Sequence, residues 1–238
     1  MSAIISSRQE WLKARQALLA EEKAFTRARE ALAAKRRALP GYVIDKPYVF
    51  QAANGPQTLA ALFGRHSQLV VYHFMFGPTW EQGCKSCSFW ADTFNGIITH
   101  LNQRDVAFAC VSSAPVERLL AFRERMGWNF EWVSSAGADF NNDFGVTGLP
   151  GKALLYNYGK SIEDAGEMPG ISVFTRTEDG GILHTYSCYA RGLDMMNAAY
   201  QFLDLVPKGR DEESLPYTMS WVKHHDLYEA APSPGTGN

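Results

Sequence analysis

The sequence is poor in cysteine and in long apolar segments. Its 238 residues contain four cysteines, too few for a disulfide scaffold. The longest strongly apolar run, residues 69–76, is far shorter than the roughly 20 residues that cross a bilayer. The first ten residues show no basic segment leading into a long apolar one, so they do not resemble a secretory signal. We therefore expect a cytoplasmic protein without a membrane segment, in a compartment where paired cysteines are catalytic or metal-binding rather than structural.

An excess of charge of one sign is also absent. Lys and Arg number 23, and Asp and Glu number 25, which gives a net charge of −2. This balance argues against a dedicated nucleic-acid-binding protein, which usually carries a basic face. Hydrophobic residues make up 46% of the chain and charged residues 20%, an ordinary composition for a globular protein with its own core.

Residues 8–37 depart from this even balance. They hold nine Lys or Arg and four Glu, a local charge of +5, so the remainder carries −7. Apolar residues recur there at every seventh position: Trp11, Leu18, Phe25, Leu32 and Leu39. The pattern predicts an amphipathic helix capped by Ser7 and stopped by Pro40-Gly41. We expect an arm over residues 1–41 that packs this apolar stripe on its own chain or on a second subunit, as in a homodimer. Nucleic-acid or membrane binding by the basic face are lesser alternatives.

The rest of the chain alternates strand-like and helix-like segments. The run at 69–76 suits a central strand that is covered on both faces. Further strands are expected at 106–111, 132–134, 153–158, 171–176 and 182–186, and helices at 84–103, 115–126 and 193–205. This order predicts one α/β domain over residues 42–228, with a mixed sheet and helices on both faces. A flexible tail is expected at 229–238.

The candidate chemistry is concentrated in Gly83-Cys84-Lys85-Ser86-Cys87, a Cys-x-x-Cys motif between a strand and a helix. A thiol at a helix N-terminus meets unpaired N–H groups and the positive end of the helix dipole, which favour the thiolate. We therefore predict that Cys84 is the attacking thiolate and that Cys87, one turn deeper, resolves the mixed disulfide. Lys85 adds a nearby positive charge, and Trp80 is expected to shelter the thiols from water.

Metal binding is the main competing interpretation of the same cysteines. A zinc ribbon needs a second closely spaced cysteine pair, which the distant Cys110 and Cys188 do not form. Cys110 is expected to be a buried, inert thiol, and Cys188 a packed residue or an auxiliary resolving thiol. A copper or zinc site could instead combine Cys84 and Cys87 with one histidine, for which His184 is the candidate.

The motifs together resemble a bacterial thioredoxin-like family of predicted dithiol-disulfide oxidoreductases, catalogued as a domain of unknown function. The matching blocks are residues 74–92, 125–128, 132–135, 184–192, 203–211 and 221–226. The resemblance implies a thioredoxin-like fold and thiol–disulfide exchange with a protein or small-molecule thiol or disulfide, without a bound organic cofactor. Such sites normally face a cis-proline loop, for which Pro169 is the candidate.

The middle of the chain also resembles peroxiredoxins. Residues 111–113 after a strand, a following helix and then residues 144–146 share their layout. Their peroxidatic pattern has Pro seven residues, and Thr or Ser three residues, before the cysteine. Gly77 and Glu81 occupy those positions before Cys84, and Trp80 and Cys84 occupy them before Cys87. A thiol peroxidase therefore stays an alternative to the oxidoreductase.

Overall fold

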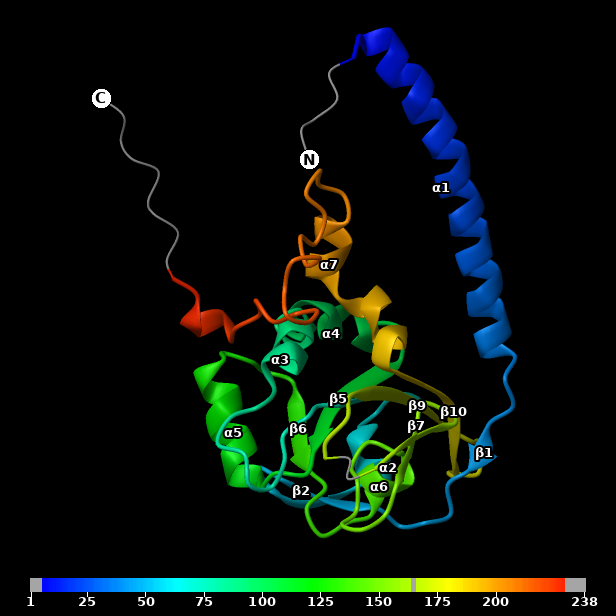
Figure 1. The fold of residues 1–238 in the computed structure, drawn as a ribbon. Coiled ribbons are helices and arrows are strands. Elements are labelled where there is room, and N and C mark those ends of the chain that lie inside the picture. Colours follow the sequence, from blue (N-terminus) through cyan, green and yellow to red (C-terminus); the bar gives the residue numbers. More distant parts are fainter. Residues whose placement is uncertain (1–5, 164–165, 230–238) are drawn as a thin grey trace.

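The protein is built around one large mixed sheet. A computed structural model describes residues 6–163 and 166–229 (Figure 1). The strands of the large sheet are β1 (Tyr42–Val43), β2 (Val49–Ala52), β3 (Gly55–Thr58), β4 (Gln68–His73), β5 (Val106–Ser112), β6 (Glu131–Ser134), β9 (Gly170–Arg176) and β10 (Ile182–Tyr189). Their order across the sheet is β1-β10-β9-β4-β5-β6-β2-β3. A separate hairpin is formed by β7 (Leu154–Tyr156) and β8 (Lys160–Ile162).

Strand β4 occupies the centre of this sheet, as its continuous apolar sequence predicts. It runs parallel to β5 and antiparallel to β9, and β5 in turn runs parallel to β6. Parallel neighbours need crossover connections, and the helices after β4 and β5 supply them. The predicted α/β fold is confirmed: a thioredoxin-like mixed sheet with a β9–β10 hairpin on one side of the parallel strands.

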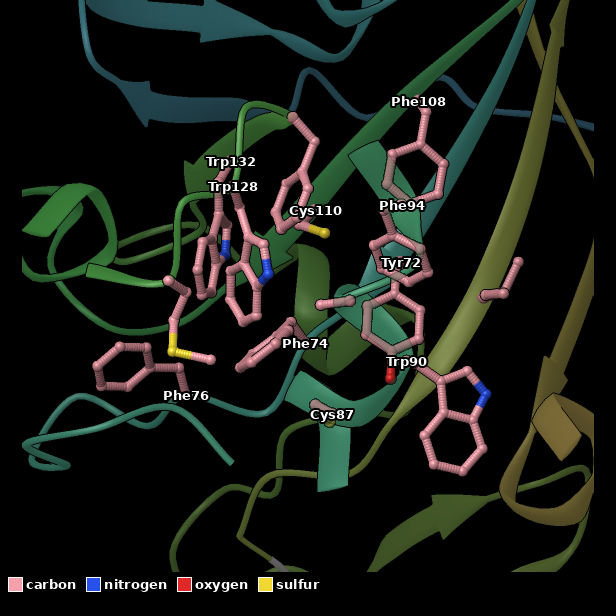
Figure 2. Packing of buried hydrophobic residues seen from close by; sticks show 14 of the residues in the cluster. Tyr72, Phe74, Phe76, Cys87, Trp90, Phe94, Phe108, Cys110, Trp128 and Trp132 are labelled. Carbon is pink, nitrogen blue, oxygen red and sulfur yellow. The ribbon is translucent and has the colours of Figure 1, made fainter. Parts of the chain in front are cut away.

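Helices cover both faces of the sheet. One face packs against α3 (Lys85–Ala91), α4 (Phe94–Asn102), α5 (Val116–Arg125) and α7 (Ala198–Leu203), and the other against α2 (Leu59–Leu62) and α6 (Phe140–Asp143). Side chains of β4 alternate between the faces, so Tyr72 belongs to the first cluster and Val71 to the second. In the first cluster the rings of Phe108, Phe94 and Tyr72 form a row that leads toward α3 (Figure 2).

Two predicted helices are interrupted for local reasons. The segment expected to form one helix at 84–103 forms α3 and α4, because the Thr93 hydroxyl donates to the Trp90 carbonyl (2.8 Å) and competes with the helical ladder. The closing helix begins as the 3₁₀ segment η1 (Ala190–Met196). The Asn197 side chain then caps α7 by accepting from the Tyr200 N–H (3.0 Å). A second 3₁₀ turn, η2 (His225–Leu227), lies near the end of the described chain.

The N-terminal arm forms the long amphipathic helix α1 (Arg8–Arg37). Ser7 and Glu10 make a reciprocal capping box, which confirms the predicted start. The apolar stripe does not pack on the body: α1 has no buried residue among those described, and Phe25 is 69% exposed. Figure 1 shows the helix projecting away from the sheet. Packing on the same chain was therefore a wrong expectation, whereas packing on a second subunit stays a prediction. No described helix combines the length and the apolar character needed to span a membrane.

Candidate active site

Cys84 and Cys87 lie at the start of the first helix after the central strand. Strand β4 ends at His73 and α3 begins at Lys85, so Cys84 is the N-cap residue of α3. The Cys84 N–H donates to the Met75 carbonyl (3.0 Å), which ties the start of the helix to the chain that leaves β4. Because the motif directly follows β4, both cysteines lie at the carboxyl end of the parallel strands.

The residue before Cys84 is glycine because the site leaves no space for a side chain. A Cβ on Gly83 would lie 2.7 Å from Phe74 Cε1 and 2.9 Å from Phe122 Cε1. Gly77 is similarly constrained, since a Cβ there would lie 2.9 Å from Trp80 Nε1. The indole of Trp80 therefore packs over Gly77, in the loop ahead of the cysteines. Its predicted role in sheltering the thiols stays a prediction.

The two thiols differ in exposure. Both are free, and the two cysteines lie 4.0 Å apart. Cys84 is partly buried, whereas Cys87 is only 2% exposed. Figure 2 shows Cys87 on α3, close to the hydroxyl end of Tyr72. A visiting molecule can therefore meet Cys84 before it meets Cys87.

The pKa of Cys84 is lowered to about 6. The largest cause is the hydrogen bond from the Cys87 thiol; burial opposes it, and the backbone N–H groups of Cys87 and Ser86 and the Ser86 hydroxyl add to the lowering. These donors belong to the first turn of α3, whose N–H groups have no carbonyl partner within the helix. At neutral pH Cys84 is therefore largely a thiolate, the form of cysteine that acts as a nucleophile.

The pKa of Cys87 shifts in the opposite direction, well above its ordinary value. Burial is the largest cause, and the bond and charge of Cys84 add to it. The Met75 N–H, which donates to Cys87 Sγ (3.5 Å), and the Tyr72 hydroxyl offset part of this rise. Cys87 therefore stays protonated while Cys84 carries the negative charge.

Lys85 makes a structural contact. Its ammonium donates to the carbonyl of Ser220 (3.0 Å), in the C-terminal segment, by which we mean residues 212–228. The charge predicted to act on Cys84 is thus partnered by a carbonyl from the other end of the chain.

Sequence reasoning missed that this C-terminal segment borders the dithiol. Three further contacts attach it to α3 and the loop before it: His224 Nε2 to the Gly83 carbonyl (2.9 Å), His225 Nδ1 to Asp92 Oδ1 (2.7 Å), and the Trp221 ring edge-on to Phe89 (5.4 Å between centroids). Aromatic residues such as Trp221 and Tyr228, in an otherwise polar segment, are a sequence signal that part of it packs. Nothing in the sequence indicated where it packs.

A cavity of about 260 Å³ adjoins the buried thiol. Its lining comes from α3, the end of β4, η1, α7 and the C-terminal segment, and includes Tyr72, Cys87, Trp90, Pro169, Tyr200 and Met219. The predicted site residue Pro169 therefore lies at the dithiol site. It is not a cis-proline, because no peptide bond within the described ranges is cis.

The structure does not assemble the alternative metal site. His184 packs on the opposite face of the sheet from Cys87, against Phe144 and Phe174, and its Nε2 bonds to Ser187 Oγ (2.7 Å). Across residues 6–163 and 166–229, no three His, Cys, Asp or Glu side chains are grouped as metal ligands. His73, at the end of β4, is buried on that same face against Phe140 and Phe144, and burial is the main reason its pKa falls to about 3.

The other two cysteines lie in the core, as expected. Cys110 is fully buried in β5, and burial raises its pKa well above the ordinary value. Cys188 is 8% exposed, and burial also raises its pKa. Neither thiol has the lowered pKa of Cys84.

Comparisons with solved structures return peroxiredoxins at low similarity. The peroxidoxin BcpB from Mycobacterium tuberculosis is 17% identical, with a TM-score of 0.45 over 67% of this chain and 94% of that one. A peroxiredoxin Q of Xanthomonas campestris is 19% identical, with a TM-score of 0.42 over 69% and 95%. The mitochondrial 2-Cys peroxiredoxin of Plasmodium falciparum is 12% identical, with a TM-score of 0.41 over 70% and 92%. At these TM-scores the likeness carries no argument about activity or substrate.

The sequence comparisons identify the family. No curated protein matches the chain. One family model matches residues 1–228, which span the arm, the sheet and the C-terminal segment, and it is described as "Bacterial protein of unknown function (DUF899)". The chain therefore belongs to this DUF899 family of bacterial proteins of unknown function.

Proposed function

We propose that this protein is a thiol–disulfide oxidoreductase with Cys84 as nucleophile and Cys87 as resolving thiol. The observation that carries the proposal is the geometry of the pair: the partly exposed Cys84 is the N-cap residue of α3 and lies 4.0 Å from the buried Cys87. The lowered pKa of Cys84 and the raised pKa of Cys87 agree with this arrangement. One accessible thiolate beside one buried thiol matches the two successive roles that disulfide exchange requires.

The reaction then proceeds in two displacements. The Cys84 thiolate attacks one sulfur of a substrate disulfide, the substrate S–S bond breaks, and the other half leaves as a thiolate that takes a proton. Cys87 loses its proton and attacks Cys84 Sγ, which forms the Cys84–Cys87 disulfide and releases the second half as a thiol. The protein dithiol is oxidised by two electrons and the substrate disulfide is reduced by two. A dithiol reductant returns the protein to its starting state.

The deciding experiment measures reduction of insulin disulfides with dithiothreitol as the electron source. We expect Cys84→Ser to lower the rate to that of dithiothreitol alone. Cys87→Ser should keep the first displacement and accumulate a mixed disulfide on Cys84, visible by mass spectrometry. Cys188→Ser is the matched control, because Cys188 is buried and is not in the dithiol. Undiminished activity in Cys84→Ser would refute the proposal.

Two further measurements separate this proposal from its alternatives. A peroxidase would be oxidised by hydrogen peroxide much faster than an ordinary exposed thiol, whereas we expect a comparable rate once both rates are divided by the fraction of thiolate present. A metal protein would purify with zinc or copper bound in a stoichiometric amount that depends on both cysteines. Stoichiometric metal lost in Cys84→Ser would favour that alternative.

A further inference from the structure

The cavity beside Cys87 has mostly apolar walls. Trp90, Leu193 and Met219 contribute large apolar side chains, and Met75 lies where the chain leaves β4. The Trp90 indole N–H is satisfied by the Leu193 carbonyl (2.9 Å), so the ring presents carbon to the cavity. Walls of this kind favour an occupant with a hydrocarbon body.

The charges at the rim are already compensated. Asp194 accepts two hydrogen bonds from the Arg210 guanidinium, each of 2.9 Å. Arg191 lies 4.0 Å from the same carboxylate, and its side chain is 80% exposed to solvent. The charged side chains of the lining are therefore either paired, as Asp194 is, or directed to solvent, as Arg191 is. The charge nearest the cavity sulfur is that of the Cys84 thiolate, which disfavours an anionic group in the cavity.

The size of the cavity limits the occupant to a small molecule. Its volume of about 260 Å³ lies just below the usual range of about 300–1,000 Å³ for ligand pockets. Glutathione disulfide is much larger than this and is charged at both ends. A five-membered cyclic disulfide on a short alkyl chain has a suitable size and polarity.

The cavity also leads to the reacting atoms. Cys87 is part of its wall, and Cys84 lies 4.0 Å from Cys87. Cys84 itself is not part of the lining, so a disulfide whose body occupies the cavity meets Cys87 directly and needs to reach about one sulfur–sulfur spacing further to meet Cys84. The Tyr72 hydroxyl, which interacts with Cys87, lines the same space.

From this geometry we infer that the substrate is a small, uncharged organic disulfide whose apolar body occupies the cavity. The inference rests on the proposed function and specifies its substrate class. For a cyclic disulfide, the Cys84 thiolate attacks one ring sulfur, the ring S–S bond breaks, and the second ring sulfur takes a proton. Cys87 then displaces the first ring sulfur from Cys84. One enzyme dithiol and one cyclic disulfide become one enzyme disulfide and one substrate dithiol, with two electrons and two protons transferred.

The test compares lipoamide with glutathione disulfide as oxidants of the fully reduced protein. Each rate is divided by the rate at which dithiothreitol reduces the same compound, which removes the difference in intrinsic reactivity. We expect a normalised preference for lipoamide of at least about tenfold, the range that a fitted apolar pocket provides. Equal normalised rates would overturn the inference and leave the proposed function intact. Failure to reduce lipoamide by a protein that still reduces insulin would overturn the inference alone, whereas failure with insulin as well would overturn the proposed function.

A substitution at the rim of the cavity tests whether the substrate binds there. Thr218 is exposed and lines the cavity, so Thr218→Trp adds bulk at the entrance without disturbing the core. We expect it to lower the lipoamide rate at least about fivefold more than the glutathione disulfide rate. The control is Tyr217→Trp, because the adjacent Tyr217 is 62% exposed and does not line the cavity. An unchanged ratio of the two rates in Thr218→Trp would place the substrate elsewhere.

Binding without chemistry gives an independent measurement. In Cys84→Ser, saturating lipoamide should raise the thermal unfolding midpoint, because a ligand that binds only the folded state stabilises it. Thr218→Trp in the same background should remove that rise, and Tyr217→Trp should keep it. A rise that persists with Thr218→Trp would contradict binding in this cavity.

Discussion

Helices α1 and α3 are stabilised in opposite ways. α1 is 30 residues long and buries no side chain among those described, whereas α3 has only seven residues and buries four of them: Cys87, Ser88, Trp90 and Ala91. α1 relies on its capping box, on a last turn rich in basic residues, and on surface pairs such as Arg15–Glu22. α3 lacks a side-chain cap and is held by packing on the sheet and by the C-terminal segment. The comparison teaches that packing, rather than helix length, fixes the geometry of the dithiol.

The strongest test of this comparison exchanges one tryptophan in each region for alanine. Trp221 packs on Phe89 of α3 and donates to Glu212 Oε1 (2.6 Å), whereas Trp11 of α1 is 56% exposed. We expect Trp221→Ala to lower the free energy of unfolding by about 3 kcal/mol, because packing is lost and a carboxylate loses a donor. Trp11→Ala should change it by less than about 0.5 kcal/mol. Urea unfolding of both variants measures the difference, and equal losses would contradict the contrast.

Two glycines of the α/β domain, one at a packed position and one at an exposed position, test the same contrast between packed and unpacked segments. Gly83→Ala would force a methyl group against Phe74 and Phe122, and should cost about 1–3 kcal/mol and slow disulfide exchange. Gly96 lies inside α4, and a Cβ there would have no atom within 4 Å. Gly96→Ala should therefore stabilise the protein by about 0.5–1 kcal/mol. The unfolding midpoints of Gly83→Ala and Gly96→Ala should shift in opposite directions. An increase in both would show that the loop before α3 can move to accommodate a methyl group at position 83.

The lowered pKa of Cys84 predicts a dependence of stability on pH. Its thiol has a pKa of about 6 in the folded protein and an ordinary value near 8.5 when unfolded, so the thiolate favours folding. This contribution is complete above the unfolded pKa, declines as pH falls toward 6, and is absent below it. The difference in unfolding free energy between the reduced protein and Cys84→Ser should accordingly grow from about pH 6 to pH 8.5. Thiolate absorbance near 240 nm should titrate around pH 6, and a midpoint near 8.5 would contradict the lowered pKa.

Much of the fold could be predicted because it depends on local patterns. The continuous apolar run of β4 indicated a strand buried on both faces. The expected strands 171–176 and 182–186 flank Glu178-Asp179-Gly180-Gly181, a sequence typical of the turn that joins β9 to β10. Ser7 with Glu10 gave the start of α1. The cysteine motif was visible for the same reason, because its residues are neighbours in sequence.

The remainder of the site depends on contacts between distant segments. The bond from Lys85 to Ser220 joins residues 135 positions apart, and that from His224 to Gly83 joins residues 141 apart. The face of the sheet on which His184 lies could not be predicted from the sequence either, because the pairing of β10 with β9 shifts register between His184 and Tyr186. A bulge of this kind changes which face a side chain occupies, and periodicity alone does not reveal it.

The smallest effect on folding is expected from charge placed on the apolar stripe of α1. Phe25 and Leu32 are 69% and 47% exposed, so Phe25→Glu with Leu32→Glu should leave the unfolding midpoint of the body nearly unchanged. The same pair should abolish self-association, because buried glutamates would oppose each other in an interface between two copies. Ala20→Glu with Ala34→Glu is the matched control: the charge change is identical, but at 3.6 residues per turn these positions lie opposite Phe25. Sedimentation equilibrium should give a dimer for the parent and for this control, and a monomer for the stripe variant. A monomeric parent would refute the expected homodimer and leave the role of the stripe to a different partner.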